Sequence, residues 1–142
     1  LVIAGNVPDE HRFWFELEVA PYIDGGQIRY IGAVDDAQKN ALLGGARALL
    51  MPILWEEPFG MVMAEAMACG AAVATSRFVG IGLEGSLRHG ETCVTFETGN
   101  VEDAADAIVV DIEALPVVAD RLRVYWSKVS SVSPQGRLEF RK

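Results

Sequence analysis

Short apolar stretches alternate with amphipathic ones along most of the chain. Stretches with the length and composition of strands lie at residues 1–5, 27–32, 48–54, 71–75 and 92–96. Stretches with helical features lie between and after them, at residues 9–20, 35–46, 61–69 and 101–114. Strands that alternate with helices at this short spacing predict a parallel sheet covered on both faces. The expected fold class is therefore α/β, with a doubly wound, Rossmann-like parallel sheet.

Apolar positions at helical spacing predict which sides of the helices turn toward a core. The stripes comprise Phe13, Leu17 and Ala20 in the first helix, Ala37, Ala41 and Leu42 in the second, and Ala104, Ala105, Ile108 and Ile112 in the fourth. The third helix, from Met61 to Cys69, is apolar at every position except Glu65. We therefore expect the third helix to be buried on most sides.

Two carboxylates flank the start of this third helix. Glu57 precedes a tight connection at Gly60, where the helix dipole and free backbone N–H groups favour anions. Glu65 lies within the helix, where a lone carboxylate needs a partner. The pair therefore flanks a natural phosphate-binding helix end. A structural interpretation is equally open: Glu57 lies near a positive helix end for stability alone, and Glu65 reaches a surface arginine.

Length and composition predict one globular domain over residues 1–129 and a flexible tail over residues 130–142. The chain has 142 residues, of which 51% are hydrophobic, so it can bury a core, but no run of 18 apolar residues predicts a membrane span. A second helix is expected after Pro116, to about Val129. The segment 130–142 is polar, with several serines, which indicates a frayed or disordered end.

Charge and cysteine content exclude several functional classes. Twelve Lys and Arg residues stand against 20 Asp and Glu residues, a net charge of −8, and the basic residues are scattered. Nucleic-acid binding needs a basic footprint, so it is not expected. Cys69 and Cys93 lie far apart without a CxxC pattern, which supports neither a metal site nor a disulfide. A reducing, cytoplasmic location is the expectation.

Two further segments carry candidate chemistry. The glycine-rich segment from Gly80 to Gly85 follows a predicted strand, where it is either a plain loop or part of a ligand site, because ligands bind at the carboxyl ends of parallel strands. His89 stands beside Gly90 with no second His or Cys near it. We expect His89 to be exposed and structural rather than a metal ligand.

The segment from Trp55 to Ala74 resembles the signature of the family-four retaining glycosyltransferases, also described as glycosyl transferases group 1, which have the GT-B fold. The E-x7-E spacing of Glu57 and Glu65, the Pro-Phe-Gly turn and the Ala-Met-Ala-Cys-Gly helix end occur together. Supporting segments lie in the expected order, at residues 1–5, 31–32, 51–52, 80–84 and 89–92. The resemblance covers about residues 1–114.

The resemblance implies a role for each matching residue. Glu57 would be the catalytic-site carboxylate that bonds the hydroxyls of the transferred sugar near its anomeric centre, and Glu65 would bind the nucleotide ribose. Backbone N–H groups of Phe59, Gly60, Met61 and Val62 would meet the diphosphate or the sugar. The donor would be a UDP- or GDP-linked sugar, transferred to an acceptor hydroxyl with retention, and no metal or other cofactor is implied.

The resemblance also implies that residues 1–129 form the C-terminal half of a GT-B enzyme. The N-terminal acceptor domain, the first strand of this domain and the Arg and Lys that hold the diphosphate would precede Leu1, so we expect the chain to be inactive alone. The missing N-terminal domain would be a partner and the route to peripheral membrane association, and self-association is a further expectation. Two departures from the family pattern stand at residues 71–72 and 93–94.

Two other functions remain open from the sequence. One is a non-catalytic interaction module that keeps the fold, which exposed apolar area at Trp14, Phe59 or Trp126 would support. The other is a nucleotide-sugar epimerase or hydrolase of the same GT-B class. The base, the sugar and the acceptor are not specified by the residues.

Overall fold

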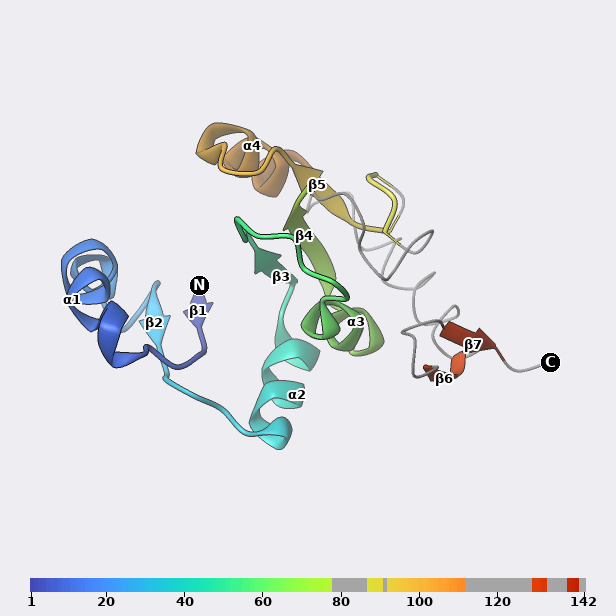
Figure 1. Cartoon of the computed structure of the whole chain (residues 1–142), viewed down its shortest axis with the longest axis horizontal. Coiled ribbons are helices and arrows are strands. Elements are labelled where there is room, and N and C mark those ends of the chain that lie inside the picture. Colours follow the sequence, from blue (N-terminus) through green and yellow to red (C-terminus); the bar gives the residue numbers. More distant parts are fainter. Residues whose placement is uncertain (78–86, 91, 112–128, 133–137, 141–142) are drawn as a thin grey trace. The chain divides into compact units, whose positions relative to one another are not determined.

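The computed structural model describes residues 1–77, 87–90, 92–111, 129–132 and 138–140 (Figure 1). The chain divides into two compact units, residues 1–39 and 40–142, and each is described by itself. Two predicted features lie outside the described residues, the glycine-rich segment at residues 80–85 and Trp126. The predicted helix at residues 116–129 also lies outside them, except for its last residue. The expectation of one domain over residues 1–129 stays a prediction.

The first unit contains two short parallel strands and one α-helix. Strand β1 (Val2–Ile3) pairs with β2 (Arg29–Tyr30), and the pairing continues past the strands through a hydrogen bond from the Gly5 N–H to the Gly32 carbonyl, 2.8 Å. Helix α1 (Asp9–Glu18) begins where the sequence predicts and is followed by the 3₁₀ helix η1 (Ala20–Tyr22). Both strands are shorter than the apolar stretches that predicted them.

The apolar stripe predicted for the first helix is wrong in part: Ala20, which lies in η1, is half-buried, but a different residue of α1 faces the strands. Phe13 and Leu17 are 79% and 60% exposed, and α1 has no buried residue. Phe15 instead meets the Tyr30 ring, with the ring centroids 4.8 Å apart.

Helix α2 (Asp36–Gly45) begins with reciprocal side-chain capping. The Gln38 N–H donates to Asp35 Oδ1 at 2.8 Å, and the Asp35 N–H donates to Gln38 Oε1 at 3.0 Å, which is a capping box. The capping box starts the helix that the sequence predicts over residues 35–46. The predicted inward stripe is wrong in part: Ala37 and Ala41 are exposed and Leu42 is half-buried, whereas Leu43 is buried. The buried side of α2 is therefore about one residue out of phase with the predicted stripe.

The second unit is built on a parallel sheet with the order β3-β4-β5 (Figure 1). Strand β3 (Ala48–Met51) pairs with β4 (Ala72–Ser76), and β4 pairs with β5 (Val94–Phe96). Helix α3 (Met61–Ala68) connects β3 to β4, and helix α4 (Val101–Asp111) follows β5. The parallel strands and intervening helices confirm the predicted Rossmann-like α/β class.

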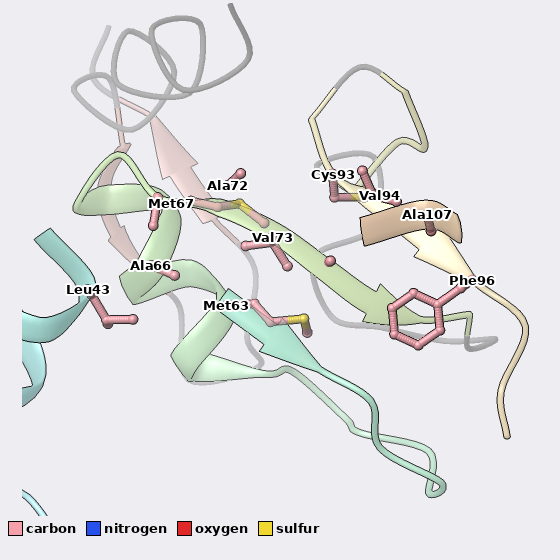
Figure 2. Close-up of a cluster of buried hydrophobic side chains, with 12 residues drawn as sticks. Leu43, Met63, Ala66, Met67, Ala72, Val73, Cys93, Val94, Phe96 and Ala107 are labelled. Atoms are coloured by element: carbon pink, nitrogen blue, oxygen red, sulfur yellow. The ribbon is translucent and has the colours of Figure 1, made fainter. Parts of the chain in front are cut away.

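The core of the second unit surrounds β4, whose five residues are all buried (Figure 2). Met63, Ala66 and Met67 enter it from α3, and Cys93, Val94 and Phe96 from the fifth strand and the residue before it. The other buried apolar residues in the described part of this unit are Leu43, Ala71, Ala72, Val73, Ala74 and Ala107. Burial raises the pKa of the Cys93 thiol to about 11, so this cysteine behaves as a small core residue.

Helices α3 and α4 both contribute buried residues to the core of the second unit. In α3 only Met61 and Ala68, near its two ends, are exposed, and the six residues between them are buried or half-buried, which agrees with the expected burial on most sides. In α4, Ala104 and Ile108 pack against the core as predicted, but Ala105 is exposed and Ala107 is buried instead. Ile112 lies outside the described residues.

A pair of antiparallel strands, β6 (Val129–Val132) and β7 (Leu138–Phe140), lies within the polar C-terminal stretch. The pattern of the sequence does not predict this pairing, and the flexibility of residues 130–142 stays a prediction. Among the described residues, no helix combines the length and the apolar character needed to cross a membrane.

Gly60, within the described part of the chain, is a position that tolerates a side chain poorly. Its φ of +69° lies in the left-handed region, and an added Cβ would overlap Met63 Cε, which belongs to a fully buried side chain. We expect Gly60→Ala to lower the free energy of unfolding by about 1–3 kcal/mol, measured by urea denaturation.

Gly44→Ala is the matched control for this substitution. Gly44 lies in α2, has no positive φ, and leaves room for a Cβ with no atom within 4 Å. Alanine there should raise stability by about 0.5–1 kcal/mol, because it favours the helix. Equal stability of Gly60→Ala and the wild type would contradict the role assigned to Gly60.

Candidate functional site

The carboxyl ends of β3, β4 and β5 lie at one edge of the sheet, because the three strands are parallel. Thr75 Oγ1 donates to the Met51 carbonyl at 3.3 Å, which ties the end of β4 to the end of β3. The Arg77 N–H donates to the Phe96 carbonyl, and Thr98 Oγ1 donates to the Arg77 carbonyl, both at 2.7 Å. Ligands of open α/β sheets bind outside this edge, so the segments that follow the strands form the candidate site.

The loops after β3 and β5 lie next to each other at this edge. A Cβ added at Gly99 would lie 3.9 Å from Leu54 Cδ2, which is ordinary van der Waals contact. After β5, an open hollow is lined by the residues from Glu97 to Glu102. Asn100 caps α4 there, with its Oδ1 accepting from the Asp103 N–H at 3.0 Å. Loop 52–60 therefore borders a second loop that also follows a strand.

The carboxylate of Glu57 is hydrogen-bonded at both oxygens. Oε1 accepts from the N–H groups of Gly60 and Phe59, at 3.1 and 3.4 Å, and Oε2 accepts from the indole Nε1 of Trp55 at 3.2 Å. Glu57 is half-buried and Trp55 is exposed. The Glu57 carboxylate thus forms hydrogen bonds with the tight turn at Gly60, which the sequence predicts before α3.

These contacts lower the pKa of Glu57 below its ordinary value of 4.5. The Gly60 N–H has the largest effect, followed by the Trp55 indole and the Phe59 N–H. Each donor stabilises the ionised form, whereas partial burial opposes it. Glu57 is therefore a carboxylate at neutral pH, an acceptor of hydrogen bonds rather than an acid.

Gly60 precedes α3 as its N-cap residue, and the first N–H groups of the helix have no carbonyl partner within the helix. The Gly60 carbonyl accepts from the N–H groups of Met63 and Ala64, at 2.9 and 3.4 Å. Within the described residues, the N–H groups of Met61 and Val62 donate no hydrogen bond, as is usual for a first helical turn. Of the four predicted backbone donors, Phe59 and Gly60 therefore bond to Glu57, while Met61 and Val62 remain available.

Glu65 lies on α3, one turn after the exposed Met61. It is half-buried, and the exposed Ala68 follows one turn later on the same side. The side chains of Met63 and Met67 point into the core instead (Figure 2). The helix therefore places Glu65 between the core face and the exposed face of α3.

Two residues at this edge were not singled out by the sequence analysis. Trp55, the indole donor to Glu57, could have been found from its place two residues before the motif carboxylate. Ser76, at the end of β4, has a buried hydroxyl without a hydrogen-bond partner among the described residues. A serine closing an apolar strand is a weak signal, since it is also common in ordinary strand ends.

His89 has a structural role, as predicted. It is exposed, and its Nδ1 accepts from the Thr95 N–H at 3.0 Å, which holds the turn at Gly90 against β5. This bond requires the proton of a neutral ring to lie on Nε2. The segment from Gly80 to Gly85 lies outside the described residues, so both interpretations of it stay open.

Comparison with known proteins identifies the family. The profile of the family described as glycosyl transferases group 1 matches residues 1–113. A phosphatidyl-myo-inositol mannosyltransferase of Mycobacterium leprae is 38% identical over 112 residues, 73% of this chain and 29% of that protein. The enzyme of that name from Propionibacterium freudenreichii is 36% identical over 87 residues, 58% of this chain and 22% of that protein. The chain thus spans less than a third of these relatives.

Solved structures share the fold. Anabaena HepE, crystallised with UDP and glucose, superimposes with a TM-score of 0.73 at 19% identity, over 89% of this chain and 35% of HepE. A sucrose-phosphate synthase from Thermosynechococcus elongatus superimposes with a TM-score of 0.70 at 26% identity, over 87% of this chain and 32% of that protein. With residues 1–113 matched by the family profile and the Rossmann-like fold of GT-B enzymes, this chain belongs to the glycosyl transferases group 1 family.

Proposed function

We propose that this chain is the donor-binding domain of a retaining glycosyltransferase of family four, the C-terminal half of a GT-B enzyme. It binds a nucleoside diphosphate sugar, UDP- or GDP-linked, whose glycosyl group is transferred to an acceptor hydroxyl. The observation that carries the proposal is the Glu57 carboxylate held on the Gly60 turn, directly before the free N–H groups of α3.

Each part of the donor meets a group suited to it. The N–H groups of Met61 and Val62 offer hydrogen bonds to the diphosphate, and the helix dipole adds favourable charge there. Glu57 accepts from sugar hydroxyls, because it is ionised at neutral pH and has no proton to give. Glu65 accepts from the ribose hydroxyls. As the glycosidic bond breaks, charge grows on the diphosphate, and fixed N–H donors stabilise it without reorganisation.

Relatives and structural neighbours support a nucleotide-sugar ligand. The curated relatives are mannosyltransferases, and HepE structures contain UDP or UDP-glucose. Mannose and glucose are therefore the first sugars to test. Glu57, Glu65 and the N–H groups of Met61 and Val62 all belong to this chain, so their part in donor binding can be measured on the chain itself, whatever the acceptor is.

The first test is binding of UDP-glucose and GDP-mannose by isothermal titration calorimetry. We expect the wild type to bind at least one of them, and Glu65→Gln to weaken that binding by about 10–100-fold, the cost of losing charge-assisted hydrogen bonds. Glu16→Gln, an exposed glutamate of α1, is the control and should bind like the wild type. Undetectable binding of both compounds at millimolar concentration would refute the proposed site.

The second test uses the pH dependence of Glu57. Because the folded pKa is lowered, the ionised carboxylate stabilises the folded state fully above 4.5, and this stabilisation is lost as pH falls through the folded pKa. We expect Glu57→Gln to be less stable than the wild type at neutral pH, and the difference to shrink as the pH falls below 4.5. Urea denaturation over a pH series measures it, and donor affinity should be lower in Glu57→Gln at neutral pH.

Glu56→Gln is the matched control for this series, since Glu56 is the adjacent glutamate, is exposed, and accepts no hydrogen bond within the described residues. Glu56→Gln removes one negative charge, as Glu57→Gln does, but at the adjacent position. If Glu56→Gln and Glu57→Gln changed stability with the same pH profile, the effect would be one of net charge, and the role assigned to the Glu57 carboxylate would be wrong.

A second candidate function is a non-catalytic interaction module. One observation favours it: Phe13 and Trp14 of α1 are 79% and 60% exposed, and α1 has no buried residue. Phe59 does not add to this surface, because it is half-buried against the core. This alternative predicts self-association that Trp14→Ser weakens, measured by sedimentation velocity. A strictly monomeric wild type that binds a nucleotide sugar would contradict it.

A further inference from the structure

Trp55 contributes little to the core, so packing does not account for its presence. It lies in loop 52–60, outside helices and strands, and is 60% exposed; the preceding Leu54 is 74% exposed. A large aromatic residue in that position forgoes much of its hydrophobic stabilisation. Its polar atom, in contrast, has a specific partner, since Nε1 donates to Glu57 Oε2 at 3.2 Å.

The hydrogen bond from Trp55 restricts the last side-chain torsion of Glu57, which the backbone donors restrict only weakly. The two N–H donors of the turn, from Gly60 and Phe59, both bond to Oε1. Rotation about the last torsion of a glutamate is broad, so bonds to one oxygen restrict the plane of the carboxylate weakly. The Trp55 indole holds the second oxygen, and the two contacts together define the plane.

The same contact determines which acceptor position remains for another molecule. A carboxylate offers about two acceptor positions on each oxygen. Among the described residues, Oε1 accepts two N–H groups, whereas Oε2 accepts only the indole N–H. The remaining position is therefore on Oε2, beside the exposed Trp55 ring.

We propose that Trp55 is a positioning residue for Glu57, whose indole N–H orients the carboxylate so that Oε2 can accept a hydrogen bond from a hydroxyl of the donor sugar. The inference rests on the proposed function for the identity of that hydroxyl. The contact between the two side chains stands on the geometry alone, so the experiment separates the two parts.

The contact is tested by NMR on the full chain with ¹³C-labelled glutamate, the Glu57 signal being assigned with Glu57→Gln. In Trp55→Phe, which keeps a ring and removes the N–H, the pKa of Glu57 should rise, because a donor to the ionised form is lost. In the wild type, the Trp55 indole N–H signal should titrate together with Glu57. Trp14→Phe is the matched control: Trp14 is equally exposed, 60%, and its indole has no hydrogen bond among the described residues.

The functional part is tested by the affinity for UDP-glucose and GDP-mannose. Trp55→Phe should weaken binding of the compound that the wild type binds by about 3–10-fold, and Trp14→Phe should not change it. An unchanged Glu57 titration in Trp55→Phe would refute the contact. A raised pKa with unchanged affinity would refute the positioning role. Absence of binding by the wild type would refute the proposed function and the donor role of Trp55, while the titration still decides on the contact.

Discussion

The packing of α3 against β3 and β4 is the constraint on which the candidate site depends. Met63 and Met67 are fully buried against the sheet, so the helix has one rotation about its axis and one height along the strands. Gly60 must then bring the chain from the loop after β3 into that helix within a single left-handed residue. Glu57, the turn donors and Glu65 have their positions because this helix cannot slide.

The candidate site combines carboxylates with backbone N–H groups that can bind anions. A net charge of −8 does not attract a diphosphate to the chain. Two glutamates flank the helix end and add negative charge there. The repulsion between Glu57 and a nearby anion is limited because three N–H donors already stabilise the negative charge of Glu57. The N–H groups of Met61 and Val62 remain for a second anion. Local backbone dipoles, rather than net charge, therefore decide what can bind at this edge.

The sequence predicted the fold class and most elements because strand and helix signals agree with the tertiary structure. Asp35 and Gln38, for example, carry a capping box that depends on local chemistry only. Burial was predicted less well. Ala37, Ala41 and Ala105 are exposed because alanine fits either side of a helix, and its presence does not indicate which side meets the sheet. The β6–β7 pairing was missed because its polar segment lacks the alternation typical of strands.

The site was predicted as residue types in a spacing, but its hydrogen bonds depend on three-dimensional detail that spacing does not contain. The motif assigned Phe59 and Gly60 the same task as Met61 and Val62, since all four N–H groups precede or begin α3. The left-handed Gly60 lies between the two pairs: the first two N–H groups precede its φ torsion and bond to Glu57, and the other two follow it at the start of the helix. One backbone angle thus separates a pair of donors that orders the carboxylate from a pair that is open to a ligand. For this reason a carboxylate and an anion can be accommodated at the same helix end.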